Sequence, residues 1–244
     1  MEVIRSAQNG VVKRIAKLKQ KKYRDELSMF FTEGYRNVSD TCAARPKDVL
    51  AVVFDERGYA ARGGEFADFD TYVVDNAVFA KLTDTESSQG VLCINRLPVS
   101  KPPTDVAIVL LDRVRDPGNV GTILRSCCAF GYGAVLCGCA DVYSPKVVRS
   151  AMSAVLKCNI STDVTAADVK AAGYELICAD MDGESVISAQ KPRGKYCIVI
   201  GNEADGVDDG IKKLCDRTVS VPQRNIESLN AGVAAGILMF ALNN

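Results

Sequence analysis

The hydrophobic residues form two kinds of pattern along the chain, short continuous runs and positions spaced three and four residues apart. Continuous runs are typical of buried strands, whereas the wider spacing predicts one apolar face of a helix. In the second half the two patterns alternate, which predicts a parallel sheet covered by helices on both faces. The expected strands are residues 106–111, 134–137, 175–179, 196–200 and 218–221, and the expected helices are 119–130, 145–155, 166–172, 210–215 and 228–242.

The first half shows the same patterns over a shorter stretch. Residues 11–23 are expected to form a basic helix, with Val12, Ile15 and Leu18 on its apolar face. The alternation of strands with helices predicts a small α/β domain. The expected strands are residues 29–32, 49–54, 71–74 and 90–94, with a helix at 76–82 and a loop at 58–70.

A proline-rich segment separates the two halves. Leu97–Asp105 has the sequence LPVSKPPTD, and its three prolines lie between two expected strands, as in a linker. We therefore expect an α/β chain with one domain at residues 1–96, a linker at 97–105 and a second domain at 106–244.

The charge is balanced overall but uneven along the chain. The formal net charge is zero, so no global positive field indicates a nucleic-acid partner. Residues 1–24, however, contain eight Lys or Arg and a single acidic residue, Glu2. Such a segment can bind phosphate, although a solvated helix face explains the charges equally well.

Several absences narrow the class of protein. No apolar signal-peptide region precedes Arg5, and the apolar stretch 229–242 is shorter than the ~20 residues that a membrane span needs. The ten cysteines, without a secretion signal, favour a reducing cytosol, and their spacing matches no zinc site. We expect a cytoplasmic protein with no membrane and no metal, in which most cysteines are core residues.

The chain contains no histidine, which excludes Ser-His-Asp and Cys-His catalysis and any His-ligated metal. It also lacks the glycine fingerprints of dinucleotide-binding and P-loop proteins. A nucleotide-dependent oxidoreductase on a parallel sheet is therefore disfavoured.

Three segments at the carboxyl ends of expected strands carry unusual residues, and ligands of open α/β sheets bind at such ends. In the first, Asp116-Pro117-Gly118 predicts a tight turn and Asn119 can cap the next helix, which carries Arg125 near its start. A helix N-terminus beside an arginine suits an anionic group. On this segment alone, a plain turn and helix cap is the favoured interpretation.

The second segment, residues 200–207, has two acids and two glycines directly after a buried strand. Close approach of backbone to a ligand and a solvated turn explain it equally well. The third segment continues from 221–223 to 227–236, where Ser228 or Glu227 could cap the last helix. Small residues in that helix indicate that another backbone comes near, from core packing, a strand or a second subunit; they are Ala231, Gly232, Ala235 and Gly236.

Taken together, DPGNVGTILRS, IGNEADGV and VPQRNIESLNAGVAAG resemble the SpoU (TrmH-like) family of RNA 2′-O-ribose methyltransferases, over the whole of residues 106–242. Less specifically, NGVVKRIAKLKQKKYRDELSMFFTEG is similar to the start of the family's L30e-like substrate-binding domain. Asn202 and Asp205 depart from the family pattern, and neither is expected to contact the reacting groups.

The resemblance implies a deep trefoil knot of the SPOUT type in the second domain, S-adenosylmethionine as cofactor, and a homodimer formed through the knotted domain. It also implies which residues act. The functional positions are Asn119, Arg125, Glu203, Ser228 and Asn230, and the cofactor-binding positions are Ile200, Gly201, Val221, Pro222, Ser228, Leu229 and Asn230. We also predict that the first domain selects the RNA, and its candidate phosphate contacts are Lys13, Arg14, Lys17, Lys21 and Lys22.

For the chemistry, we expect Arg125 to hold a phosphate and stabilise the developing alkoxide, with Glu203 and Asn119 fixing Arg125 and the ribose. A literal proton abstraction by Arg125 is not expected, because guanidinium stays charged in proteins. Ribosomal RNA, 23S in particular, is favoured over transfer RNA. The alternatives are methylation of a base nitrogen, a tRNA 2′-O-methyltransferase, and a non-catalytic RNA-binding or assembly factor on the same fold.

Overall fold

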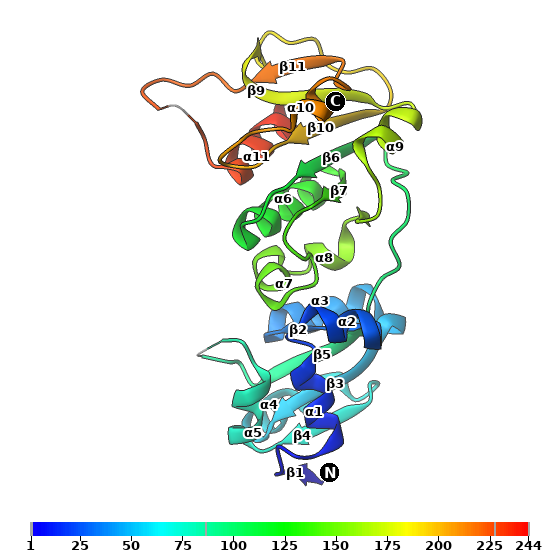
Figure 1. The fold of residues 1–244 in the computed structure, drawn as a ribbon. Coiled ribbons are helices and arrows are strands. Elements are labelled where there is room, and N and C mark those ends of the chain that lie inside the picture. Colours follow the sequence, from blue (N-terminus) through cyan, green and yellow to red (C-terminus); the bar gives the residue numbers. More distant parts are fainter. Residues whose placement is uncertain (1, 86, 227, 244) are drawn as a thin grey trace. The chain divides into compact units, whose positions relative to one another are not determined.

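The computed structural model describes residues 2–85, 87–226 and 228–243. Contacts within the chain divide it into two compact units, residues 1–98 with 143–149, and residues 99–142 with 150–244. Each unit is built around its own sheet (Figure 1).

The first unit contains a mixed five-stranded sheet with the strand order β1-β4-β3-β5-β2. Strands β1, β4 and β3 run parallel, and β5 is antiparallel to both β3 and β2. The strands are β1 Val3–Ile4, β2 Met29–Glu33, β3 Val49–Asp55, β4 Thr71–Val74 and β5 Val91–Arg96.

Helices pack on both faces of this sheet. On one face, Val12 and Ile15 of α1 and Val78 of α5 bury against β3. On the other, Val38 of α3 and Phe66 bury against the opposite side of β3. The unit is therefore a small three-layer α/β domain, as the sequence predicted. Its helices are α1 Gly10–Lys17, α2 Lys21–Leu27, α3 Tyr35–Ala44, α4 Glu56–Arg62 and α5 Asn76–Leu82, with short 3-10 turns at Pro46–Asp48 and Gly63–Phe66.

Two expectations for this unit were wrong. The single helix expected at 11–23 is two helices, because the chain turns where Leu18 enters the core and Arg24 donates to the Leu18 carbonyl at 2.8 Å. The expected loop 58–70 instead contains most of α4 and a 3-10 turn. There Asp55 caps α4 by accepting a hydrogen bond from the Gly58 amide at 2.6 Å.

The second unit contains a six-stranded sheet with the order β11-β9-β10-β6-β7-β8, and every pairing in it is parallel. The central strands β6 and β10 are continuous apolar runs whose side chains are buried on both faces. The predicted parallel sheet is confirmed. The strands are β6 Ala107–Asp112, β7 Gly133–Cys137, β8 Ile160–Ser161, β9 Glu175–Ser185, β10 Tyr196–Ile200 and β11 Arg217–Ser220.

Helices cover both faces of the second sheet, also as predicted (Figure 1). Val169 of α9 and Ile211 of α10 pack on one face, and α6 and α11 pack together on the other. The expected helix 145–155 is broken at Met152, which has a left-handed backbone with φ 54°. The helices of this unit are α6 Pro117–Phe130, α8 Ala154–Lys157, α9 Ala166–Ala171, α10 Asp209–Lys212 and α11 Ala231–Leu242. Helix α7, Pro145–Ala151, falls mostly within the segment 143–149 of the first unit.

The small residues of α11 contact α6 of the same chain. A Cβ atom on Gly232 would lie 3.0 Å from Thr122 Cγ2, and one on Gly236 would lie 3.5 Å from Ser126 Oγ. The glycines therefore permit close packing of two helices within the unit. These contacts support the core-packing interpretation of the small-residue face. The expected knot stays a prediction.

Of the ten cysteines, Cys42, Cys93, Cys127, Cys158, Cys178 and Cys197 are buried, which confirms that most are core residues. Within residues 2–85, 87–226 and 228–243, no helix has the length and apolar character to cross a membrane.

Candidate active site

The three unusual segments meet at one edge of the second sheet. Strands β6 and β10 are neighbours, with Leu111 paired to Ile200, so the segments that follow them lie side by side. Strand β11 lies on the far side of β9, and the segment after it returns across the same edge to the start of α11. The carboxyl ends of parallel strands share one edge, which explains why residues far apart in sequence come together there.

Three of the predicted functional residues form a hydrogen-bonded chain. The amide nitrogen Nδ2 of Asn119 donates to Glu203 Oε1 at 2.5 Å, and Asn230 Nδ2 donates to Asn119 Oδ1 at 2.8 Å. Asn119 is buried and bridges the other two side chains. These two bonds link all three segments and hold the Asn119 side chain in one orientation.

The helix caps differ from those expected. Asp116 caps α6 by accepting from the Asn119 amide at 2.8 Å, so Asn119 is not the cap and its side chain is available to the network. Asn230 caps α11 by accepting from the Gly232 and Val233 amides. Ser228 is therefore not the cap, and Glu227 lies outside the described residues. Each capping residue directly precedes the first residue of its helix.

Arg125 projects from α6 and its side chain is exposed. Among the described residues it has no ion pair or hydrogen-bond partner, so the network of Asn119, Glu203 and Asn230 does not fix it. Asn119 and Glu203 bond to each other in the structure, and the expectation that they fix Arg125 during the reaction stays a prediction. Arg125 remains free to meet a ligand that reaches the surface of α6.

A cavity of about 510 Å³ lies beside this network. Five of the predicted cofactor-binding residues line it, and they are Ile200, Gly201, Val221, Ser228 and Leu229. Pro222 lines an adjoining cavity of about 480 Å³ instead. Asn230 lines neither cavity, because its side chain donates a hydrogen bond to Asn119 and caps α11. The larger cavity has the size of a small-molecule binding site.

Gly201 is required by its own loop, because a Cβ there would lie 2.2 Å from the Gly206 carbonyl carbon. One observation indicates that the cavity fits a nucleoside cofactor. Gln223 places a buried carbonyl oxygen, Oε1, that has no donor among the described residues. The walls combine apolar side chains, such as Val219, Val221 and Leu238, with charged ones on other parts of the lining. Such a site suits a flat ring with a few polar groups.

Sequence patterns missed an ion pair on the cavity wall. Lys212 Nζ lies 2.6 Å from Asp180 Oδ2, and both residues line the cavity. The hydrogen bond from Lys212 lowers the pKa of Asp180, and the same bond raises the pKa of Lys212. Both groups are therefore charged at neutral pH, and the pair is kept as pH falls until Asp180 takes up a proton.

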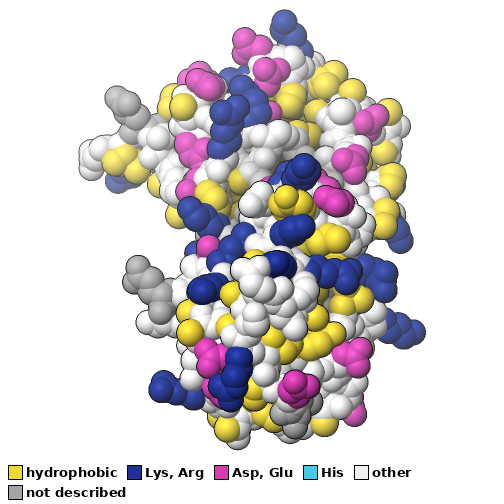
Figure 2. Space-filling model, turned by 60° about the horizontal axis from the view of Figure 1, so that its bottom comes forward, with side chains coloured by type: hydrophobic (Ala, Val, Ile, Leu, Met, Phe, Trp, Pro, Cys, Tyr) yellow, Lys and Arg dark blue, Asp and Glu magenta, His cyan; other side chains and the backbone are white. Residues whose placement is uncertain are grey.

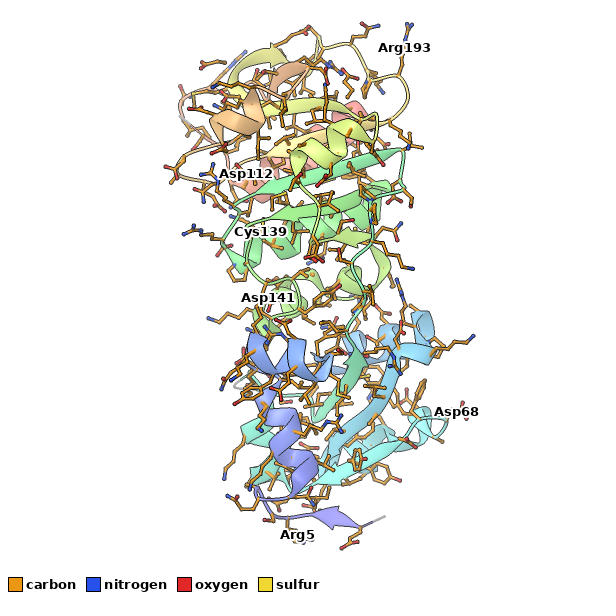
Figure 3. The ribbon with its side chains drawn as sticks, turned by 45° about the vertical axis from the view of Figure 1, so that its right-hand side comes forward. Arg5, Asp68, Asp112, Cys139, Asp141 and Arg193 are labelled. Atoms are coloured by element: carbon orange, nitrogen blue, oxygen red, sulfur yellow. The ribbon has the colours of Figure 1, made fainter. Side chains whose placement is uncertain are left out.

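A second missed group joins the ends of β6 and β10. Asp112, buried at the end of β6, accepts from the Arg113 guanidinium and from the Asp208 amide at 2.8 Å (Figure 3). The hydrogen bond to Asp112 raises the pKa of Arg113. Asn202 Nδ2 donates to the Arg113 carbonyl at 2.9 Å, which anchors the segment that carries Glu203. Asn202 was not expected to contact the reacting groups, and in the structure it positions the segment that carries Glu203.

In the first unit, the five predicted phosphate-binding side chains are exposed on α1 and α2. Lys21 is paired with Asp25 at 2.7 Å, and Lys17 and Lys22 lie over the Tyr23 ring. Lys19, in contrast, donates to the Lys81 and Thr83 carbonyls and serves the fold. Figure 2 shows positive and negative side chains interspersed on the face in view, in keeping with the balanced net charge.

Replacing Glu203 distinguishes a hydrogen-bonding role from a charge role. Glu203→Ala removes the acceptor for Asn119 and is expected to lower kcat about 10- to 100-fold, because the Asn119 side chain is released. Glu203→Gln keeps an oxygen acceptor and is expected to stay within about fivefold of the parent enzyme. Steady-state methylation rates at saturating cofactor measure both. An equal loss in the two variants would show that the carboxylate charge matters, against a positioning role.

Comparisons with known proteins agree with this geometry. The sequence profile of the SpoU rRNA Methylase family matches residues 106–240, and that of the MRM3-like substrate binding domain matches residues 9–93. A curated relative, the 23S rRNA (guanosine(2553)-2′-O)-methyltransferase RlmP of Bacillus subtilis, is 30% identical, and the alignment covers 99% of each chain.

Solved structures are similar over nearly the whole chain. An AdoMet-bound rRNA methyltransferase from Sinorhizobium meliloti has a TM-score of 0.86 at 27% identity, covering 99% of this chain and 97% of that one. The SpoU methyltransferase AviRb from Streptomyces viridochromogenes, in complex with AdoMet, has a TM-score of 0.84 at 25% identity, covering 96% and 97%.

The parallel sheet, the cavity at its carboxyl edge and the separate substrate-binding unit define an RNA methyltransferase that uses S-adenosylmethionine. The chain belongs to the SpoU rRNA methylase family.

Proposed function

We propose that this enzyme methylates a ribose 2′-hydroxyl in 23S ribosomal RNA. The observation that carries the proposal is the network of Asn119, Glu203 and Asn230 beside the cavity lined by Gly201 and Leu229. This chain is 30% identical to a 23S rRNA 2′-O-methyltransferase in an alignment that covers 99% of both chains. That similarity supports 23S rRNA as the substrate and the ribose 2′-oxygen as the methylated atom.

S-adenosylmethionine, when bound, supplies an electrophilic methyl group on its sulfonium. Ile200, Gly201, Val221, Ser228 and Leu229 would hold it, since these residues line the cavity. Pro222 and Asn230 would act from just outside, Pro222 through the adjoining cavity and Asn230 through Asn119. The chain's task is then to align the acceptor oxygen and exclude competing water.

Arg125 is the group that we assign to the acceptor side. Its guanidinium is unpaired in the described structure and lies on the same helix as Asn119, about one and a half turns further along. We assign it to the phosphate next to the target nucleotide, where its charge stabilises the 2′-oxygen as that oxygen loses its proton. The bound cofactor would supply the methyl group to this oxygen, and the proton of the 2′-hydroxyl would pass to solvent.

The function is tested by incubating the purified protein with S-adenosylmethionine and either 23S rRNA or tRNA, then mapping the methyl group. We expect a 2′-O-methyl nucleotide in 23S rRNA. A methyl group on a base, or in tRNA alone, contradicts the proposal. Cofactor binding without methylation of either RNA would support a non-catalytic RNA-binding factor instead.

We also propose that the enzyme is a cytoplasmic homodimer formed through the second unit, which carries the trefoil knot expected of its family. Val233, Ile237 and Phe240 of α11 are large apolar residues exposed at helical spacing, with Phe240 72% exposed. All three are exposed, although the Phe240 ring also lies 6.1 Å from the Phe130 ring at the end of α6. An apolar stripe of this kind suits a second copy of the same surface. The cytoplasm supplies the ribosomal substrate and keeps the cysteines reduced.

Charging this stripe is expected to separate the subunits. Phe240→Glu should raise the dimer dissociation constant at least about a hundredfold, because a carboxylate would be buried against the partner's apolar face. Light scattering coupled to size-exclusion chromatography measures the mass over a dilution series. Ile187→Glu, at an exposed apolar residue after β9, is the matched control and should leave the mass unchanged. A Phe240→Glu protein that stays dimeric at the same dilutions would contradict an interface on α11.

A further inference from the structure

Gln223 carries a polar atom that the fold leaves without a partner. Its carbonyl oxygen Oε1 is buried and accepts no hydrogen bond from any described residue. Gln223 follows β11 and lines both the main cavity and the adjoining one. A buried acceptor without a donor costs free energy, so its presence in a ligand cavity calls for a donor on the ligand.

We propose that Gln223 accepts a hydrogen bond from the exocyclic amine of the cofactor's adenine ring, and so selects an adenosyl cofactor over a deaminated one. The inference deepens the cofactor site described under the proposed function and rests on it. It adds a residue that determines which base the cavity accepts.

The position of Gln223 along the sheet edge indicates that it lies beside the adenine end of the bound cofactor. The network that marks the reacting end follows β6 and β10, whereas Gln223 follows β11. Strand β9 separates β10 from β11, so the two strand ends are roughly 10 Å apart. A cofactor whose methyl group points toward Asn119 and Glu203 therefore extends its base toward Gln223.

The chemistry of the walls points the same way. Val219, Val221 and Leu238 line the cavity with Gln223, and such side chains suit the faces of a flat ring. The charged side chains that line the cavity suit the cofactor's hydroxyl and charged groups, and they are Asp180, Lys212, Glu203 and Asp205. A neutral amide oxygen among apolar side chains suits a neutral amine, and an amide is the side chain that most often recognises adenine in nucleic acids.

The test compares two ligands and three variants by isothermal titration calorimetry. The ligands are S-adenosylhomocysteine and its 6-deamino analogue, in which hydrogen replaces the exocyclic amine. The parent enzyme should bind S-adenosylhomocysteine about tenfold more tightly than the analogue. Gln223→Met, which removes the acceptor but keeps the length of the side chain, should bind the two ligands within twofold. Gln223→Glu keeps an oxygen acceptor and should retain the preference.

Arg193→Gln is the control, because Arg193 lies on the connection that enters β10 at its amino end, opposite the cavity (Figure 3). It should leave the tenfold preference intact. Equal binding of the two ligands by the parent enzyme, or a preference that survives in Gln223→Met, overturns the role of Gln223 while the cofactor site stands. Absence of binding by either ligand to the parent enzyme overturns the cofactor site as well.

Discussion

Replacing Arg125 by alanine is expected to lower kcat about 100- to 1,000-fold while leaving the affinity for S-adenosylmethionine within about twofold. Arg125 lines neither of the cavities described at the sheet edge, so cofactor binding does not depend on it. We assign its exposed and unpaired guanidinium to stabilising the transition state. Removing one such donor raises the activation free energy by on the order of 3–4 kcal/mol. Single-turnover methylation of 23S rRNA and calorimetric titration of the cofactor measure the two effects.

Arg125→Lys sharpens the test, because lysine keeps the positive charge but loses the planar fork that binds phosphate through two hydrogen bonds. We expect it to recover part of the rate, to about tenfold below the parent enzyme. Arg193→Ala removes a comparable exposed charge and should have no effect on kcat. A normal kcat for Arg125→Ala would remove Arg125 from the chemistry altogether.

The second large effect is expected from neutralising the basic surface of α1 and α2. Changing its five residues to glutamine should weaken RNA binding at least about a hundredfold at low salt, because each phosphate contact releases a counterion. The slope of log affinity against log salt should become shallower by about 3 to 4. The residues are Lys13, Arg14, Lys17, Lys21 and Lys22, all exposed. Filter binding of a 23S rRNA fragment over a salt series measures both quantities.

A matched variant distinguishes a specific RNA-binding surface on α1 and α2 from a general effect of positive charge on RNA affinity. Lys47, Arg57 and Lys81 are exposed in the same unit but lie off α1 and α2, and replacing them should change the salt slope by less than about 1. Lys21 alone should contribute least of the five, because Asp25 already pairs with it. An unchanged affinity after neutralising all five would mean that RNA reaches the enzyme by another surface.

Much of the fold followed from local patterns. The apolar runs of β6 and β10 have a single stable environment, the middle of a sheet covered on both faces, and they predicted it correctly. The error at residues 11–23 has a tertiary cause. The helical spacing of apolar residues continues through Leu18. In the first unit, however, Leu18 is buried at a turn, where the Arg24 side chain donates a hydrogen bond to the Leu18 carbonyl. No local pattern distinguishes that turn from a continuous helix.

For the site, the three motifs and their residue types were visible in the sequence, but their partners were not. Asn119 was expected to cap its helix, whereas its side chain donates to Glu203 and accepts from Asn230, residues 84 and 111 positions away. The Asp180–Lys212 pair had no sequence signal, and Gln223 was visible only as a member of the third motif, with no role assigned to it. They reach the cavity because β9 is placed between β10 and β11.

The sequence by itself thus determined the alternation of strands and helices, the parallel sheet, the family and the residue types of the site. These depend on burial and local geometry, which act on neighbours along the chain. Only the tertiary structure decided which side chains bond to one another, that Arg125 stands apart from the network, and that Gln223 keeps an open acceptor. The physical reason is the strand order, because it sets side by side carboxyl ends that lie far apart in the sequence.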